Sequence, residues 1–199
     1  MSGHFLEIAT KRRSIYVLGN DLPLSKEDVA ALIKEAVRQA PSSFNSQSSR
    51  VVVLFGEEHK KLWEITREQL RKIVPAENFQ GTSDKMDMFA ASAGSVLFFE
   101  DETVIAGLQE QFPSYADNFP IWSEHSTGIA QYAVWLALAE QEIGANLQHY
   151  TPLIDNDVRE AWDIPASWKL RAHLNFGSVQ APAKDKTYIE DDKRFKVLG

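Results

Sequence analysis

A short basic run near the N-terminus carries the side chains that a phosphate group needs. Lys11, Arg12 and Arg13 are followed directly by Ser14. Guanidinium groups donate paired hydrogen bonds in a fixed fork that matches phosphate oxygens, and a hydroxyl adds a further donor. The run could therefore hold a dianionic phosphate, although a basic triplet is also typical of a solvated surface.

A second run, from Ala40 to Gln47, concentrates hydroxyl and amide groups between a predicted helix and a predicted strand. Such residues are common in connecting loops, so one interpretation is a polar loop. The other interpretation is a ligand site, because mixed donors and acceptors could bind the O4, N3 and O2 edge of a flavin. The residues concerned are Pro41, Ser42, Ser43, Asn45 and Gln47.

Several standard catalytic and cofactor motifs are absent from the sequence. It has no G-x-G-x-x-G turn after a strand, no Walker phosphate loop and no G-x-S-x-G nucleophile elbow. It also has no cysteine and no H-x-x-x-H pair among its five histidines, so thiol chemistry and zinc hydrolysis have no support. A cofactor would have to be held by discrete side chains.

Composition predicts one globular domain spanning residues 1–199, long enough to bury about 70 % of its unfolded surface. The formal net charge is −7, with 21 basic against 28 acidic residues, which argues against a nucleic-acid partner. The longest apolar stretch, 129–139, is too short to span a bilayer, and the N-terminus lacks the pattern of a signal peptide. We therefore expect a soluble cytoplasmic protein without a membrane partner.

Hydrophobic periodicity predicts the elements that position these runs. The clearest helix begins after Ser25, carries an i, i+3, i+4 apolar stripe and ends before Pro41. Continuous apolar runs at 51–55 and 95–99 predict buried strands. Alternation of apolar and polar residues at 170–176 predicts a half-buried strand.

The most hydrophobic segment, 129–139, is apolar on nearly every side, which predicts a central buried helix. Helices are also predicted at 57–73 and 155–162, and a strand or loop at 146–150. Less regular segments are a polar, turn-rich stretch at 75–84, an aromatic loop or short helix at 112–122 and a charged tail at 184–196. Interleaved elements with the most hydrophobic helix late in the chain favour an α+β fold.

In their order and spacing, the Arg-x-Ser run and the Pro-Ser-Ser-x-Asn-x-Gln run resemble the nitroreductase superfamily. In that family the first element binds the phosphate of FMN and the second lines the isoalloxazine ring. The chain is most similar to the short subgroup named for a fungal fatty-acid-repression protein, although Ser48 and Ser49 replace the Pro-Trp pair of larger members and Tyr16 replaces a basic residue. The resemblance continues through 96–101, 115–119, 131–135, 144–150 and 193–197.

This resemblance implies a role for each matching residue. Arg12 and Ser14 would contact the FMN phosphate, with Arg13 as a further candidate. Lys184 and Lys186 would close the phosphate site from the C-terminal side, unless they belong to a solvated tail.

At the flavin, Gln148 and His149 fall where family members offer a backbone N–H to N5, and Lys85 is a possible partner for the N1–C2=O region. The His149 side chain could donate a proton to substrate or be structural. The resemblance places the following residues at the ring and ribityl chain: Pro41, Ser42, Ser43, Asn45 and Gln47.

Four aromatic residues punctuated by prolines are candidates for a lid over the flavin, or for plain core. They are Phe112, Tyr115, Phe119 and Trp122.

The resemblance implies a three-layer α/β/α fold, with a mostly antiparallel sheet flanked by helices, in an interlocked homodimer with FMN between the subunits. Hydride would pass from NADH or NADPH to flavin N5 and then to a small nitro-aromatic or quinone-like acceptor, by ping-pong kinetics. No metal and no catalytic side chain are expected, because the flavin carries the chemistry.

Two alternatives remain open at this point. One is a different flavin reaction on the same fold, such as dehalogenation, flavin breakdown or dehydrogenation. The other is a non-catalytic flavin-binding redox sensor. Neither the physiological acceptor nor the choice between NADH and NADPH follows from the sequence.

Overall fold

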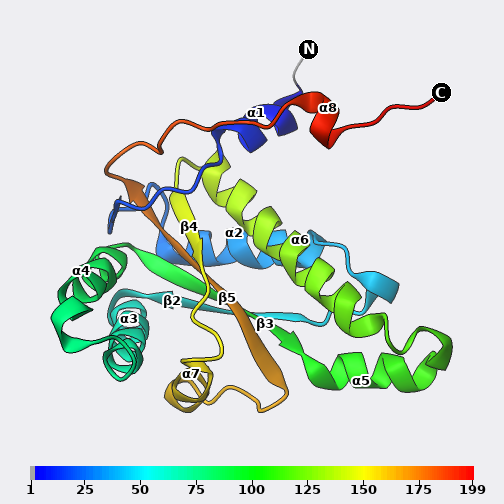
Figure 1. The fold of residues 1–199 in the computed structure, drawn as a ribbon, viewed down its shortest axis with the longest axis horizontal. Coiled ribbons are helices and arrows are strands. Elements are labelled where there is room, and N and C mark those ends of the chain that lie inside the picture. Colours follow the sequence, from blue (N-terminus) through cyan, green and yellow to red (C-terminus); the bar gives the residue numbers. More distant parts are fainter. Residues whose placement is uncertain (1–2) are drawn as a thin grey trace.

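The computed structural model describes residues 3–199 and has a five-stranded antiparallel sheet at its centre (Figure 1). The strands follow the order β1-β5-β3-β2, with β4 paired to β5 beside this path. Their bounds are β1 Leu18–Gly19, β2 Ser49–Phe55, β3 Gly94–Asp101, β4 Gly144–Gln148 and β5 Trp168–Val179. Strands β1, β3 and β4 all pair with β5, which therefore holds the sheet together.

Helices cover both faces of this sheet. α2 and α6 pack on one face, and α3, α4 and α7 pack on the other (Figure 1). Their bounds are α1 His4–Lys11, α2 Lys26–Gln39, α3 Gly56–Arg71, α4 Phe79–Ala90, α5 Glu102–Gln111, α6 Phe119–Glu140, α7 Asp155–Ala161 and α8 Asp191–Arg194. The predicted α+β fold, with helices flanking an antiparallel sheet, is confirmed.

Alternation along β3 divides the core between the two helical layers. Val96 and Phe98 pack in the cluster formed with α2 and α6, whereas Leu97 and Phe99 pack in the cluster formed with α3 and α4. Successive side chains of a strand point to opposite faces. A continuous apolar run is therefore required here, as predicted for 95–99.

Strand β5 differs from the half-buried strand predicted at 170–176, because both of its faces are buried. His173 and Asn175 are fully buried. The Asn175 Oδ1 atom accepts hydrogen bonds from Trp63 Nε1 at 3.2 Å and from Ser95 Oγ at 3.0 Å. The polar half of the alternation thus reflects a buried hydrogen-bond network and not contact with solvent.

Two helices occur where the sequence analysis indicated none. α4 overlaps the stretch 75–84, predicted as polar turns, because Phe79 and Phe89 are buried and dock it beside α3. α5 follows β3 directly and begins after Asp101, whose side chain accepts a hydrogen bond from the Thr103 amide at 3.2 Å. Tertiary burial and a local cap, respectively, account for the two helices.

α6 is longer and less enclosed than the buried helix predicted at 129–139. It begins earlier, with Pro120 in its first turn, where a missing amide hydrogen costs nothing. Leu138 is fully buried, but Ile129 and Tyr132 are 43 % and 42 % exposed. The prediction of burial on every side is therefore wrong within a single chain. In the described residues, no helix is long and apolar enough to cross a membrane.

Two buried histidines predict a loss of stability in mild acid. Burial lowers the pKa of both His59 and His173 from 6.5 to about 4. Between these values the unfolded chain binds more protons than the folded chain, so the free energy of unfolding falls as the pH decreases from about 6.5 toward about 4. The expected loss, measured by urea unfolding, is on the order of 3 kcal/mol for each histidine.

The substitution His59→Gln removes one of the two contributions. The slope of the free energy of unfolding against pH should then become clearly shallower than in the wild type. Burial raises the pKa of Glu100 and of Asp155 and works against this slope, but it does so equally in both proteins. An unchanged slope in H59Q would show that His59 is not a source of the acid sensitivity.

Candidate functional site

Two stretches from distant parts of the sequence form one pocket. Residues of the segments 12–17 and 181–186, including the acidic Asp185, line a hollow of about 520 Å³. The Arg13 guanidinium donates to the Lys184 carbonyl and joins the two stretches. Forked guanidinium groups, ammonium groups and a hydroxyl together match a dianionic phosphate. The structure thus brings together Arg12, Arg13, Ser14, Lys184 and Lys186.

The Arg12 guanidinium lies over two aromatic rings of α6. Its Cζ atom is 4.5 Å from the centroid of the Trp135 ring and 6.0 Å from that of Tyr132, within the range of cation–π attraction. Its Nε is buried and has no hydrogen-bond partner among the described residues. An unpaired buried donor is costly, so this side chain fits an anionic ligand that supplies the missing acceptor.

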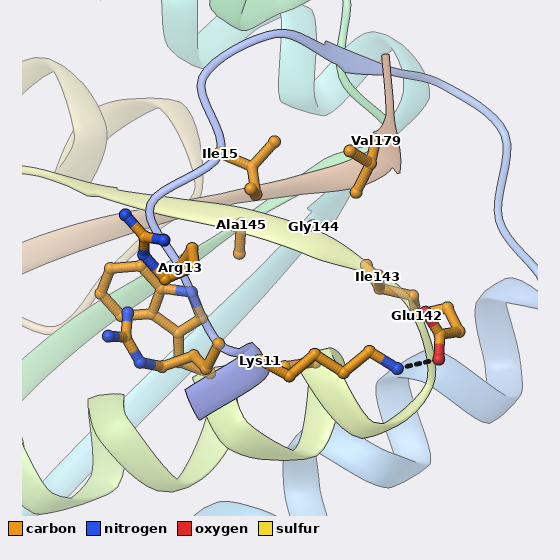
Figure 2. A pocket seen from close by; sticks show the side chains of 11 residues that line it. Lys11, Arg13, Ile15, Glu142, Ile143, Gly144, Ala145 and Val179 are labelled. Atoms are coloured by element: carbon orange, nitrogen blue, oxygen red, sulfur yellow. Dashed lines mark hydrogen bonds and ion pairs between the residues drawn. The ribbon is translucent and has the colours of Figure 1, made fainter. Parts of the chain in front are cut away.

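The basic segment is tied to the free edge of β4. The Ile15 amide donates to the Ala145 carbonyl at 2.9 Å, and the Asn146 side chain donates to the Ile15 carbonyl at 2.7 Å. At the start of the basic run, Lys11 forms an ion pair with the Glu142 carboxylate (Figure 2). The same strand ends at Gln148, directly before His149, so the residues predicted for the phosphate and those predicted for N5 lie at the two ends of β4.

The run containing Ser42 to Gln47 has an unusual backbone. The φ angles of Phe44, Asn45 and Gln47 are 56°, 49° and 49°, in the left-handed region that side chains rarely adopt. The Ser42 hydroxyl accepts a hydrogen bond from the Gln47 amide at 2.9 Å and closes the run on itself. Such conformations persist only where the surroundings enforce them, and they are concentrated at functional sites.

An aromatic cluster enforces this conformation. The Phe44 ring lies 4.9 Å from Phe112, 5.3 Å from Phe119 and 6.1 Å from Trp122, between ring centroids. Tyr115 also contacts Phe44 and is 47 % exposed, whereas Phe119 is only 2 % exposed. The four predicted lid residues therefore gather on the motif itself, with Phe119 in the core and Tyr115 at the surface.

The pocket lined by residues of 12–17 and 181–186 is called the phosphate pocket after the ligand predicted there; within one chain it does not meet the polar run 41–47. Pro41, Ser42 and Gln47 line a separate hollow of about 350 Å³ beside Ser126 and Ala130 of α6. Arg12 contacts α6 further along, at Trp135. The two hollows share no residue.

Three further predicted residues are placed as follows. Lys85 is exposed on α4 and lies with its Nζ 5.4 Å from the Phe89 ring; it lines neither hollow. Gln148 is buried and donates to the Asn146 side chain at 2.9 Å. His149, the next residue, is exposed. The roles expected for these residues remain predictions.

Ser48 and Ser49, which stand where larger members have Pro-Trp, hydrogen-bond a carboxylate that the sequence analysis did not single out. Their hydroxyls donate to the two oxygens of Glu100, each at 2.5 Å. Glu100 is fully buried, and burial raises its pKa while the two serines lower it. Ser49 also lines the hollow beside Gln47. The available signal was an acidic residue placed directly after the apolar run 96–99 of a buried strand.

We expect Ser48→Ala to lower the free energy of unfolding by about 1–3 kcal/mol at pH 7, because a buried carboxylate loses a donor. The loss should shrink as the pH falls and Glu100 becomes protonated. Ser46→Ala is the matched control, since the Ser46 hydroxyl makes no hydrogen bond within the described residues. If both variants are equally stable at pH 7, the assigned hydrogen bond contributes nothing.

Comparison with known proteins gives the family. The nitroreductase family model matches residues 9–178. Nitroreductase CinD from Lactococcus lactis is 48 % identical, covers 98 % of this chain and 100 % of its own, and superposes with a TM-score of 0.91. From Saccharomyces cerevisiae, HBN1 is 37 % identical over 94 % of each chain, and nitroreductase FRM2 is 32 % identical over 96 % of this chain and 95 % of its own. The chain therefore belongs to the nitroreductase family and is an oxidoreductase.

Proposed function

We propose that this oxidoreductase binds FMN and uses NADH or NADPH to reduce nitro-aromatic or quinone-like acceptors. The observation that carries the proposal is the pocket in which Arg12, Arg13 and Ser14 meet the 181–186 segment. Its donors match the phosphate end of FMN. CinD, which is 48 % identical, has been solved with chloramphenicol, nicotinic acid and 4-nitrophenol. Chloramphenicol and 4-nitrophenol are nitro-aromatic compounds, which supports the acceptor class.

When bound, FMN supplies the two-electron transfer between the nicotinamide and the acceptor. The protein binds FMN and orients its ring. Arg12 and Ser14 would hold the phosphate at one end of β4, and the His149 amide would donate to the ring at the other end. Asn45 and Gln47 would hydrogen-bond the polar edge of the ring. Donor and acceptor would occupy the same open face in turn, which gives ping-pong kinetics.

We further propose that two copies of the chain complete the site. The phosphate pocket and the polar run are separate in one chain, so a second copy would bring its own residues 41–47 to the first copy's β4 edge. A two-fold interface is self-complementary, and each contact occurs twice. The exposed apolar residues of α6 and α1, among them Ile129, Tyr132 and Phe5, support such an interface.

The purified protein should show the visible absorption of a flavin, either as isolated or after addition of FMN. Anaerobic NADH or NADPH should bleach these bands, and a nitro-aromatic acceptor should restore them. Bands that persist with both donors would favour a redox sensor instead. A colourless protein that takes up no FMN would contradict the proposal.

Arg12→Gln should weaken FMN binding by about 10- to 100-fold, since it removes a charged hydrogen bond worth roughly 1.5–3 kcal/mol. Titration of the apo-protein followed by flavin fluorescence measures this change. Arg71→Gln is the matched control, because Arg71 lies on α3 in the opposite helical layer. Equal affinities of R12Q and R71Q would remove Arg12 from the site.

Arg12→Gln, combined with a second variant, also tests whether the two subunits share the site. Asn45→Gly removes the amide group without straining the left-handed backbone. If R12Q and N45G are mixed and allowed to exchange subunits, a mixed dimer carries one doubly altered site and one intact site. FMN binding and turnover should therefore recover on mixing. If each chain holds a complete site, mixing restores nothing.

A further inference from the structure

His173 is fully buried on β5, where it pairs in register with Gln148 at the end of β4. Its Nδ1 atom is 3.1 Å from the Gln148 carbonyl oxygen. A carbonyl oxygen only accepts, so Nδ1 carries the proton and donates. Burial lowers the pKa of His173 to about 4, so the ring is neutral at pH 7 and Nε2 is bare. Accordingly, Nε2 is buried without a partner among the described residues.

The ring of His173 is held in place by its neighbours. Its centroid lies 6.5 Å from that of Trp63 and 6.1 Å from that of Tyr150. Trp63 is itself fixed by its hydrogen bond to Asn175. The donor that faces Gln148 is therefore part of a packed and hydrogen-bonded layer.

The direction of the Gln148 carbonyl follows from the strand. The Ala145 carbonyl accepts from Ile15, so it points to the free edge of β4, away from β5. Carbonyl groups of successive strand residues point to alternate sides, and Gln148 is three residues further on. The Gln148 carbonyl therefore points toward β5, where His173 donates to it.

The Gln148 carbonyl and the His149 amide belong to the same peptide group. This peptide is trans, since the cis bond in the described residues is Thr151–Pro152. In a planar trans peptide the C=O and N–H bonds point in opposite directions. The His149 N–H is thus directed to the free edge of β4, the edge that carries Ile15 and the basic segment.

We propose that His173 is a positioning residue, whose Nδ1–H holds the Gln148 carbonyl so that the His149 N–H faces the flavin at N5. This inference rests on the proposed function. Gln148 is the last residue of β4 that pairs with β5, and the pairing does not extend to the exposed His149, so the His173 side chain adds a second hold on the peptide group at the end of the ladder. The two histidines then have separate tasks: His149 contributes its backbone, and His173 contributes its ring.

Two variants test the role of the donor. His173→Asn keeps an N–H group close to the Nδ1 position, whereas His173→Leu has a similar size and no donor. The measurement is hydrogen exchange of the His149 amide in the FMN-loaded protein, labelled with ¹⁵N-histidine so that only five residues contribute signals. The wild type and H173N should protect this amide. H173L should bind FMN and exchange it at least about ten-fold faster, as expected for loss of one hydrogen bond.

A second measurement needs no variant. Side-chain ¹⁵N shifts of His173 in the wild type should show a protonated Nδ1 and a bare Nε2 at pH 7. The opposite tautomer would overturn the inference, and so would equal protection of the His149 amide in H173L and wild type.

The same experiments separate this inference from the proposed function. A wild type that binds FMN but leaves the His149 amide unprotected overturns the role of His173 and leaves FMN binding intact. A wild type that binds no FMN overturns both.

Discussion

The pairing of β5 with three other strands is the constraint on which the remaining structure depends. Because helices cover both faces of β5, its polar side chains must find partners inside the protein, and Asn175 and His173 do so. The β4–β5 ladder also fixes the position of β4, whose other edge binds the basic segment through Ile15. Ala145 and His149 are four residues apart, about 13 Å along a strand. One ladder thus sets the distance between the phosphate pocket and the end of β4.

Elements with strong local signals could be predicted from the sequence. The helix after Ser25 has its cap within the same four residues, since the Ser25 hydroxyl accepts from the Asp28 amide at 3.1 Å. Strand β3 is a continuous apolar run that is buried on both faces, as predicted, whereas β2 at the edge of the sheet is only partly buried apart from Leu54, so the same pattern overestimated its burial. α4 could not be predicted in this way, because its polar first turns become helical through the burial of Phe79 and the packing of Phe89 in the core. The burial of β5 was misjudged because alternation does not distinguish water from a buried polar partner.

The same distinction between local sequence signals and tertiary contacts applies to the site residues. The sequence motifs identified two groups. The structure gathers the first group in one hollow and places Pro41, Ser42 and Gln47 of the second group in another. The separation of the two groups could not be foreseen, because it depends on where along α6 each group makes its contacts. Phe44 and Glu100 were missed for a related reason. Their partners, the predicted lid aromatics for Phe44 and two serines for Glu100, are distant in sequence and come together only in the folded protein.

The late position of β5 has a consequence for biosynthesis. The central strand spans 168–179, and the second half of the phosphate pocket follows at 181–186. A nascent chain that has reached the end of α7 therefore contains the paired strands β2 and β3 and the helices α1 to α7, but it lacks the strand that connects β3 to β1 and β4. Domains generally fold as units. Here the full sheet, and the pocket lined by residues from 12–17 and 181–186, form only after β5 has been made, so any ligand that binds in this pocket requires a completed sheet.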